Sequence, residues 1–215
     1  MIAERPAVLR AEGLDFGFAG HPVFNGLNLS IPAGVTWVGG DESTGKTTLL
    51  RLLAGDLEAG SGTFAINGIA LNQRAPTYRD QVFWVNPGTD AFDSLTPQAY
   101  WDRLPKPYPT FDSAVLTRLV QALGLTAHLH KSMYMLSTGT KRKIFLAASF
   151  AASAAVTLID EPFAALDKAS IDAVLELLRD AAQDPNRACV VADYLAPRGI
   201  PLTGTVVLKS AGNAS

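Results

Sequence analysis

Apolar and polar residues alternate along two stretches near the start of the chain, residues 8–18 and 27–31. Alternation with a period of two is typical of strands with one buried face, so we expect two antiparallel strands here. Turn-forming residues at 20–22 (Gly, His, Pro) and at 25–26 (Asn, Gly) predict hairpin turns between them.

Apolar runs then alternate with stretches of helical periodicity along the rest of the chain. Short runs rich in β-branched residues predict strands at residues 35–38, 63–66, 81–85, 156–159, 189–192 and 205–208. Helical periodicity with plausible caps predicts helices at residues 47–54, 112–123, 137–152 and 171–182. Strands that alternate with helices predict an α/β fold with a mainly parallel sheet and an antiparallel β edge subdomain.

The stretch from 89 to 137 has a different character. Prolines punctuate it at positions 97, 105, 107 and 109, and its clearest pattern is the helix that Asp112 caps. We expect a helical subdomain at about residues 88–139, inserted within one domain that spans residues 1–215.

Composition narrows the class of protein. Hydrophobic residues make up 48% of the 215 residues, which is ample for a core. The net charge of −2 does not favour nucleic-acid binding, so we expect no nucleic-acid partner. Cys189 is the only cysteine, so no disulfide can form within the chain, which fits a reducing compartment. The longest charge-free run, residues 144–159, is shorter than the roughly 20 residues of a membrane helix.

The first functional motif follows the strand predicted at residues 35–38. Residues 40–47 fit G-x-x-x-x-G-K-[ST], a phosphate-binding loop between a strand and a helix. Such a loop directs backbone N–H groups and the positive end of a helix at a phosphate chain. Lys46 supplies a charge for the β- and γ-phosphates, and the Thr47 hydroxyl suits Mg²⁺. The predicted nucleotide-binding residues of this loop are Gly40, Asp41, Glu42, Ser43, Thr44, Gly45, Lys46, Thr47 and Thr48.

Two adjacent carboxylates end the buried strand predicted at residues 156–159. Ligands bind at the carboxyl ends of parallel strands, so we expect Asp160 and Glu161 to lie beside the phosphate loop. One carboxylate can hold Mg²⁺ and the next can take a proton from a water that attacks the γ-phosphate. The sequence therefore predicts binding and hydrolysis of a nucleoside triphosphate.

Over nearly its whole length the chain resembles the ATP-binding subunit of an ATP-binding cassette (ABC) transporter. Residues 160–162 and 165–167 look like that family's second nucleotide motif and its D-loop, which includes Asp167. Residues 136–143, Leu-Ser-Thr-Gly-Thr-Lys-Arg-Lys, look like the family signature, and the motifs follow the family's order and spacing.

The resemblance implies a head-to-tail pair of subunits with two ATP molecules between them. It implies that Lys46, Thr47, Asp160 and Glu161 serve the chain's own ATP, with Mg²⁺ held by Thr47 and Asp160. The signature residues Ser137, Thr138 and Gly139 would then cap the ATP of the partner subunit, which is either a second copy or a different ABC subunit. A separate transmembrane permease subunit is implied as well, and would hold this subunit at the inner face of the membrane.

One aromatic residue near the start of the chain matches a further family position. Phe18 matches the aromatic on which adenine stacks, and Phe16, two residues before it on the same strand face, is the alternative. Packing against the sheet is the other interpretation of either ring.

The chain departs from the family pattern at three places. Where the family has a glutamine after the strand at 81–85, this chain has Pro87, or Asn86 if the alignment slips by one. Where the family has a histidine that contacts the γ-phosphate, this chain has Asp193. In the signature, Thr138 replaces the first glycine and Thr140 the usual glutamine, while the basic residues that follow resemble one group of exporters.

A carboxylate at Asp193 repels phosphate by roughly 3 kcal/mol at ~5 Å and an effective dielectric near 20. Asp193 is tolerable there if it is protonated, turned away or sharing the cation. We therefore expect ATP to bind well and hydrolysis to be slowed by roughly a hundredfold or more. The alternative is a regulatory, nearly non-hydrolysing half of a heteromeric ABC complex.

Other conspicuous residues have ordinary interpretations. His128 and His130 lack neighbours that would complete a metal site, and Cys189 lies in an apolar strand typical of the core. Trp84 and Trp101 favour core packing over contact with a membrane partner.

Overall fold

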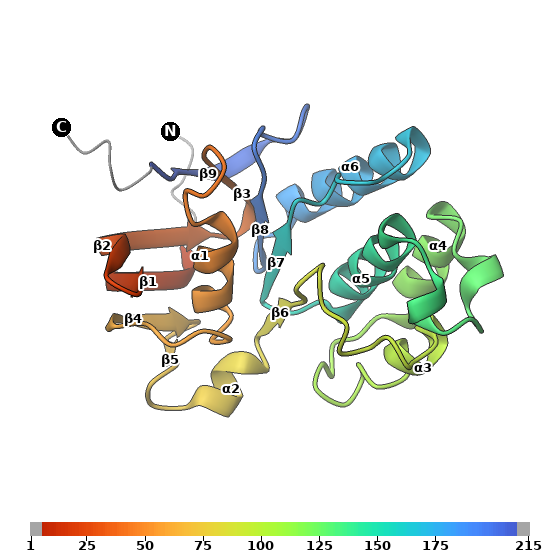
Figure 1. Ribbon diagram of the computed structural model, residues 1–215, viewed down its shortest axis with the longest axis horizontal. Coiled ribbons are helices and arrows are strands. Elements are labelled where there is room, and N and C mark those ends of the chain that lie inside the picture. Colours follow the sequence, from red (N-terminus) through yellow and green to blue (C-terminus); the bar gives the residue numbers. More distant parts are fainter. Residues whose placement is uncertain (1–5, 210–215) are drawn as a thin grey trace.

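Two β-sheets and a group of helices make up the chain, and a computed structural model describes residues 6–209 of it (Figure 1). The antiparallel sheet lies on one side, the parallel sheet in the middle and helices α3, α4 and α5 on the other side. Residues 1–5 and 210–215, which the expected single domain includes, lie outside the described part. In chain order the elements are β1 (Ala7–Phe18), β2 (His21–Pro32), β3 (Gly34–Gly39), α1 (Lys46–Leu53), β4 (Ser61–Ile66), β5 (Ile69–Ala70), α2 (Ala75–Arg79), β6 (Val82–Trp84), α3 (Pro97–Trp101), α4 (Ser113–Ala122), the 3₁₀ turns Thr126–His128 and Met133–Met135, α5 (Thr138–Ala152), β7 (Val156–Asp160), α6 (Lys168–Gln183), β8 (Ala188–Ala192) and β9 (Leu202–Val207).

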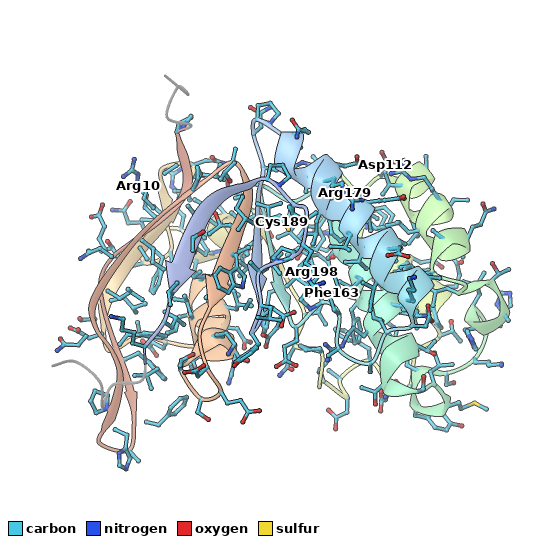
Figure 2. All side chains as sticks on the ribbon, turned by 90° about the horizontal axis from the view of Figure 1, so that it is seen from above. Arg10, Asp112, Phe163, Arg179, Cys189 and Arg198 are labelled. Atoms are coloured by element: carbon cyan, nitrogen blue, oxygen red, sulfur yellow. The ribbon has the colours of Figure 1, made fainter. Side chains whose placement is uncertain are left out.

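The central sheet has the order β6-β7-β8-β3-β9, and all its neighbouring strands run parallel. Strands β7 and β8 are buried along their whole length, and successive side chains of β8 enter different cores. Cys189 and Val191 join the core with the helices, while Val190 and Ala192 join the core with α1 and the antiparallel sheet. Cys189, which Figure 2 labels beside α6, is 4% exposed, so its prediction as a core residue is confirmed.

The second sheet is antiparallel, with the order β2-β1-β4-β5. Helix α1 packs between it and the central sheet through buried leucines such as Leu49 and Leu53. The predicted parallel sheet with an antiparallel β subdomain is confirmed. The strands of that subdomain form a sheet of their own, separate from the parallel sheet.

The β1–β2 hairpin turns at Ala19 and Gly20, so the turn predicted at Asn25-Gly26 is wrong. Both of those residues lie inside β2, where the β1–β2 register shifts. There the Gly26 amide donates a 2.6 Å hydrogen bond to Oδ1 of Asp15, so a side chain takes part in the irregular pairing.

Several helices and strands begin or end at other residues than predicted, because capping side chains and strand pairing decide where each one begins and ends. Helix α6 begins at Lys168, three residues before the predicted start at Ile171, because Asp167 caps it by accepting from the Ser170 amide at 2.9 Å. Strand β6 is shorter than predicted, and β9 starts and ends earlier. The cap predicted at Asp112 is confirmed, and Ser137, the predicted start of a helix, caps α5.

The helical region shares one hydrophobic core with the central sheet. Trp101, at the end of α3, is 1% exposed and its Nε1 donates to the Ile144 carbonyl at 3.2 Å, so the packing interpretation of Trp101 holds. Trp84 is half-buried and packs against the core beside α1. The limits of an inserted subdomain at about 88–139 stay a prediction. Between residues 6 and 209 none of the helices has the length and apolar character needed to cross a membrane.

Candidate functional site

The loop between β3 and α1 has a tight backbone that its two motif glycines make possible. Gly40 has φ +152°, and a Cβ there would lie 2.6 Å from Thr44 Oγ1 and 2.7 Å from the Leu208 carbonyl. Gly45 has φ +93°, and a Cβ there would lie 2.6 Å from Val23 in β2. Only glycine fits both positions without strain, which explains the spacing of the motif.

Two side chains of the motif donate hydrogen bonds to the loop's own backbone. Lys46 Nζ donates to the carbonyls of Gly40 and Asp41, each at 2.8 Å, so the ammonium group lies across the loop. Thr44 is buried and donates to the same Asp41 carbonyl at 2.9 Å. Exposed residues at the crest are Asp41, Glu42 and Ser43, while Thr48 is half-buried in α1.

The structure brings the first turn of α1 against the end of β7. Thr47 Oγ1 donates a 2.6 Å hydrogen bond to Oδ2 of Asp160, which is only 9% exposed. Burial, followed by the negative charge of Glu161, raises the pKa of Asp160, while the Thr47 bond and the charges of Arg142 and Lys46 oppose that rise. A hydroxyl and a carboxylate at one point are hard oxygen ligands, and they fit Mg²⁺.

Glu161 comes directly after this carboxylate and has an unusual backbone. Its backbone φ is +46°, a value that residues with a side chain rarely adopt. Its amide donates to the Ala192 carbonyl at 2.8 Å. Its own carbonyl accepts from the Arg142 guanidinium and, at 3.2 Å, from the Ala164 amide. Glu161 is exposed at the edge of the sheet where β7 and β8 end.

Asp193 comes directly after β8, and its backbone forms hydrogen bonds with the neighbouring strand β3. Its amide donates to the Val38 carbonyl at 3.1 Å, and its carbonyl accepts from Trp37 Nε1 at 3.1 Å. Its Oδ1 accepts a 2.6 Å hydrogen bond from the Tyr194 amide. The carboxylate is therefore held at the same sheet edge as Glu161.

The charges at this edge interact with one another. Burial first, and then the negative charge of Glu161, raises the pKa of Asp193, while hydrogen bonds from nearby amides and the charge of Lys46 lower it. The charges of Glu161 and Lys46 act on the pKa of Asp160 in the same directions. The sequence-predicted residues Lys46, Asp160, Glu161 and Asp193 thus form one electrostatic group.

The two positions predicted as equivalents of the family's glutamine have different surroundings. Asn86 Oδ1 accepts from the Gly88 amide at 2.9 Å, so this oxygen closes a local turn. Pro87 lines a small cavity of about 30 Å³ together with Asp160 and Arg142. Of the two residues, Pro87 is thus the one that lies toward Asp160.

The signature segment begins α5. Ser137 caps the helix, its Oγ accepting from the Thr140 amide at 3.2 Å, and both Ser137 and Thr138 are exposed. A Cβ on Gly139 would lie 2.3 Å from the Ala165 carbonyl of the same chain. No hydrogen bond within residues 6–209 joins this segment to the phosphate loop.

Each of the three basic residues that end the signature segment contacts a residue outside α5, Lys141 in the loop before α3 and the other two in the loop between β7 and α6. Lys141 pairs with Asp93 at 2.5 Å, Arg142 donates to the Glu161 carbonyl, and Lys143 pairs with Asp167 at 2.6 Å. The sequence shows the basic run but not these targets, because all three contacts join residues distant in the chain. Arg142 is the functional candidate that sequence reasoning missed.

The two candidate aromatics pack edge to face, with centroids 4.8 Å apart and planes at 87°. Phe16 packs partly into the core, whereas Phe18, at the end of β1, is 50% exposed. Phe18 is therefore the ring with a free face.

Between residues 6 and 209 no cluster of three or more metal-ligand side chains exists, at His128 and His130 or elsewhere.

A glycine-rich loop between a parallel strand and a helix, faced by a carboxylate from the next strand but one, defines a P-loop nucleotide-binding protein. Within that class, the family model described as ABC transporter matches residues 24–164, most of the chain. The chain therefore belongs to the ABC transporter family, among its ATP-binding proteins.

Similar proteins include both exporters and importers by name. The cytochrome c biogenesis ATP-binding export protein CcmA of Cupriavidus pinatubonensis is 31% identical over 196 residues, 89% of this chain and 86% of the relative. The nickel import ATP-binding protein NikO of Rhodobacter capsulatus is 29% identical, over 95% of this chain and 86% of the relative. A solved structure of the ATP-binding subunit of an ABC transporter superposes with a TM-score of 0.79 at 22% identity, covering 93% and 88% of the two chains, which supports the fold.

Proposed function

We propose that this chain is the ATPase subunit of an ABC transporter and that it couples ATP binding and hydrolysis to transport, with reduced turnover. The observation that carries the proposal is the 2.6 Å contact between Thr47 Oγ1 and Asp160 Oδ2 at the open end of the phosphate loop. It joins the two side chains that would hold Mg²⁺ of a bound Mg·ATP at the place where Lys46 lies.

The residues of this edge have distinct roles in the proposal. The loop amides and Lys46 bind and orient the phosphates, and the exposed ring of Phe18 stacks on adenine. Glu161 accepts a proton from the water that attacks the γ-phosphate. Mg²⁺, when held by Thr47 and Asp160, would neutralise charge on the phosphates.

The exposed start of α5 supports a dimer. The helix N-terminus at Ser137, followed by Gly139, offers N–H groups and a positive dipole end to the γ-phosphate of a partner subunit, a second copy or another ABC subunit. Tyr134 and Met135, just before Ser137, are large apolar side chains that the chain leaves exposed. Exposed apolar groups of this kind favour contact with another protein. In this proposal a transmembrane permease is a further partner and holds the subunit at the inner face of the membrane.

Asp193 is the reason for proposing reduced turnover. Its carboxylate is fixed by the Tyr194 amide and lies in the electrostatic group of Glu161 and Lys46, where it opposes the γ-phosphate. Pro87 adds to this, because proline has no side-chain donor or acceptor to orient a water. The same two residues favour the second candidate, a regulatory half that binds ATP and scarcely hydrolyses it.

Phosphate release from Mg·ATP by the purified chain tests the proposal, alongside Glu161→Gln and Asp193→His. We expect slow release by the unchanged chain, none by Glu161→Gln, and faster release by Asp193→His. If the unchanged chain binds ATP but releases no phosphate, and Asp193→His restores release, the regulatory half is the correct function. Failure to bind ATP would refute both.

A further inference from the structure

Arg142 links the signature helix to the loop that carries the proposed base. It lies in the second turn of α5, and its guanidinium donates to the backbone carbonyl of Glu161, 19 residues further along the chain. Hydrogen bonds from a charged donor are stronger than those between neutral groups. The contact therefore fixes the peptide unit that follows Glu161.

The backbone at Glu161 needs such support. Its φ of +46° is sparsely populated for a residue with a side chain, and such a conformation persists only where surrounding contacts hold it. The Ala192 carbonyl holds its amide at 2.8 Å, and Arg142 together with the Ala164 amide holds its carbonyl. Because the backbone angles of Glu161 set the direction of its side chain, these contacts aim the carboxylate.

Arg142 also lies close to Asp160. It lines the cavity of about 30 Å³ that Pro87 and Asp160 line, and its buried Nε has no hydrogen-bond partner within the described chain. Pro87 offers this cavity no donor. The positive charge of Arg142 acts on Asp160 as well, where it opposes the rise in the pKa of that carboxyl.

We propose that Arg142 is a positioning residue for ATP hydrolysis, which holds the carbonyl of Glu161 from α5 and so fixes the direction of the carboxylate that acts as base. The inference rests on the proposed role of Glu161. Helix α5, whose start is proposed to contact the ATP of the partner subunit, would then have a second role within its own subunit. Because Arg142 belongs to this helix, any shift of α5 would move the side chain that holds the Glu161 carbonyl.

The experiment compares Arg142→Ala and Arg142→Lys with Arg118→Ala, a matched loss of an exposed arginine on α4. Steady-state phosphate release gives kcat and KM, and hydrogen–deuterium exchange of residues 160–167 reports the loop directly. The Ala164 amide is a suitable reporter, since it donates to the Glu161 carbonyl.

For Arg142→Ala we expect kcat to fall by roughly ten- to hundredfold, the effect of a small misplacement of a reacting group, with KM within about twofold. Exchange at residues 161–166 should quicken. Arg142→Lys keeps the charge but not the planar fork, so it should restore kcat only in part and leave exchange fast. Arg118→Ala should match the unchanged chain.

Unchanged kcat and unchanged exchange in both Arg142 variants would overturn the inference, as would a loss that lies wholly in KM. If Arg142→Ala does not fold, Arg142→Lys decides by the same two measurements. If the unchanged chain releases no phosphate, the proposed hydrolysis has failed, whereas the holding of Glu161 by Arg142 still stands or falls on the exchange rates.

Discussion

The hydroxyl of Thr47 donates a 2.6 Å hydrogen bond to Oδ2 of Asp160, and so joins the phosphate loop to the end of β7, the next strand but one from β3 in the central sheet. Thr47 belongs to the first turn of α1 and Asp160 is the last residue of β7, 113 positions later. The fold thus holds a hydroxyl and a carboxylate together, and in the proposed function these two oxygens would hold Mg²⁺ with little reorganisation.

Removing the Thr47 hydroxyl should weaken the binding of Mg·ATP specifically. For Thr47→Ala we expect about tenfold weaker binding in Mg²⁺, equivalent to roughly 1.4 kcal/mol, because Asp160 loses its partner and the cation a ligand. Thr47→Ser keeps the hydroxyl and should bind nearly as the unchanged chain does. Calorimetric titration with ATP in Mg²⁺ and in EDTA measures both, and an equal loss in EDTA would contradict a role in holding the cation.

Asp193→Asn should stabilise the fold at neutral pH. The folded pKa of Asp193 is raised, chiefly by burial, so the folded chain binds this proton more tightly than the unfolded chain does. Stability from this group therefore falls as pH rises from about 3.9, the ordinary value, through the raised pKa. Asparagine keeps an oxygen for the Tyr194 amide and removes the charge.

Thermal melts of the Asp193→Asn variant from pH 4 to pH 8 measure this effect. We expect the variant to melt higher at pH 7 and the difference to shrink toward pH 4. ATP should also bind about tenfold tighter, since the repulsion, at most roughly 3 kcal/mol, is screened in part by Lys46 and solvent. A variant that melts lower at pH 7 would show that the charge is compensated.

Gly139→Ala should destabilise the chain although alanine favours helices. The gain in helix propensity is up to about 1 kcal/mol, but overpacking costs about 1–3 kcal/mol. Overpacking prevails here because a Cβ would lie 2.3 Å from the Ala165 carbonyl, which is backbone and cannot turn aside. Urea unfolding measures the difference, with Gly88→Ala as the control, since a Cβ there meets nothing closer than 3.5 Å. Equal stability of both variants would contradict this explanation of Gly139.

Local signals explain what the sequence predicted of the fold. Asp112 and Ser137 cap their helices because a short polar side chain can satisfy amides two or three residues away, whatever the rest of the chain does. The helices at α2 and α3 escaped prediction because they are single turns with proline near the start, too short to show a period.

Long-range contacts explain what could not be predicted. Asn25-Gly26 has the composition of a turn, yet pairing of β2 with β1 keeps it inside a strand. At the candidate site, motifs indicated which residue types gather at the sheet edge, because parallel strand ends meet there. The contact of Arg142 with the Glu161 carbonyl left no motif, since any basic run has many possible partners.

The ion pair between Lys143 and Asp167 should make the start of α6 sensitive to acid. The hydrogen bond from Lys143, followed by that from the Ser170 amide, lowers the pKa of Asp167, so the folded chain holds this proton less tightly than the unfolded chain. The stabilisation is therefore complete above about 3.9 and is lost as pH falls toward the lower folded value. Asp167→Asn keeps an oxygen for the cap and loses the charge, whereas Asp167→Ala loses both. At pH 7 we expect the melting temperature to be lowest for Asp167→Ala, with Asp167→Asn between it and the unchanged chain. The difference in melting temperature between Asp167→Asn and the unchanged chain should shrink toward pH 3. Glu176→Gln, an exposed change on the same helix, should leave the melting temperature almost as it is, and a gap at Asp167→Asn that is independent of pH would rule out the charge as its cause.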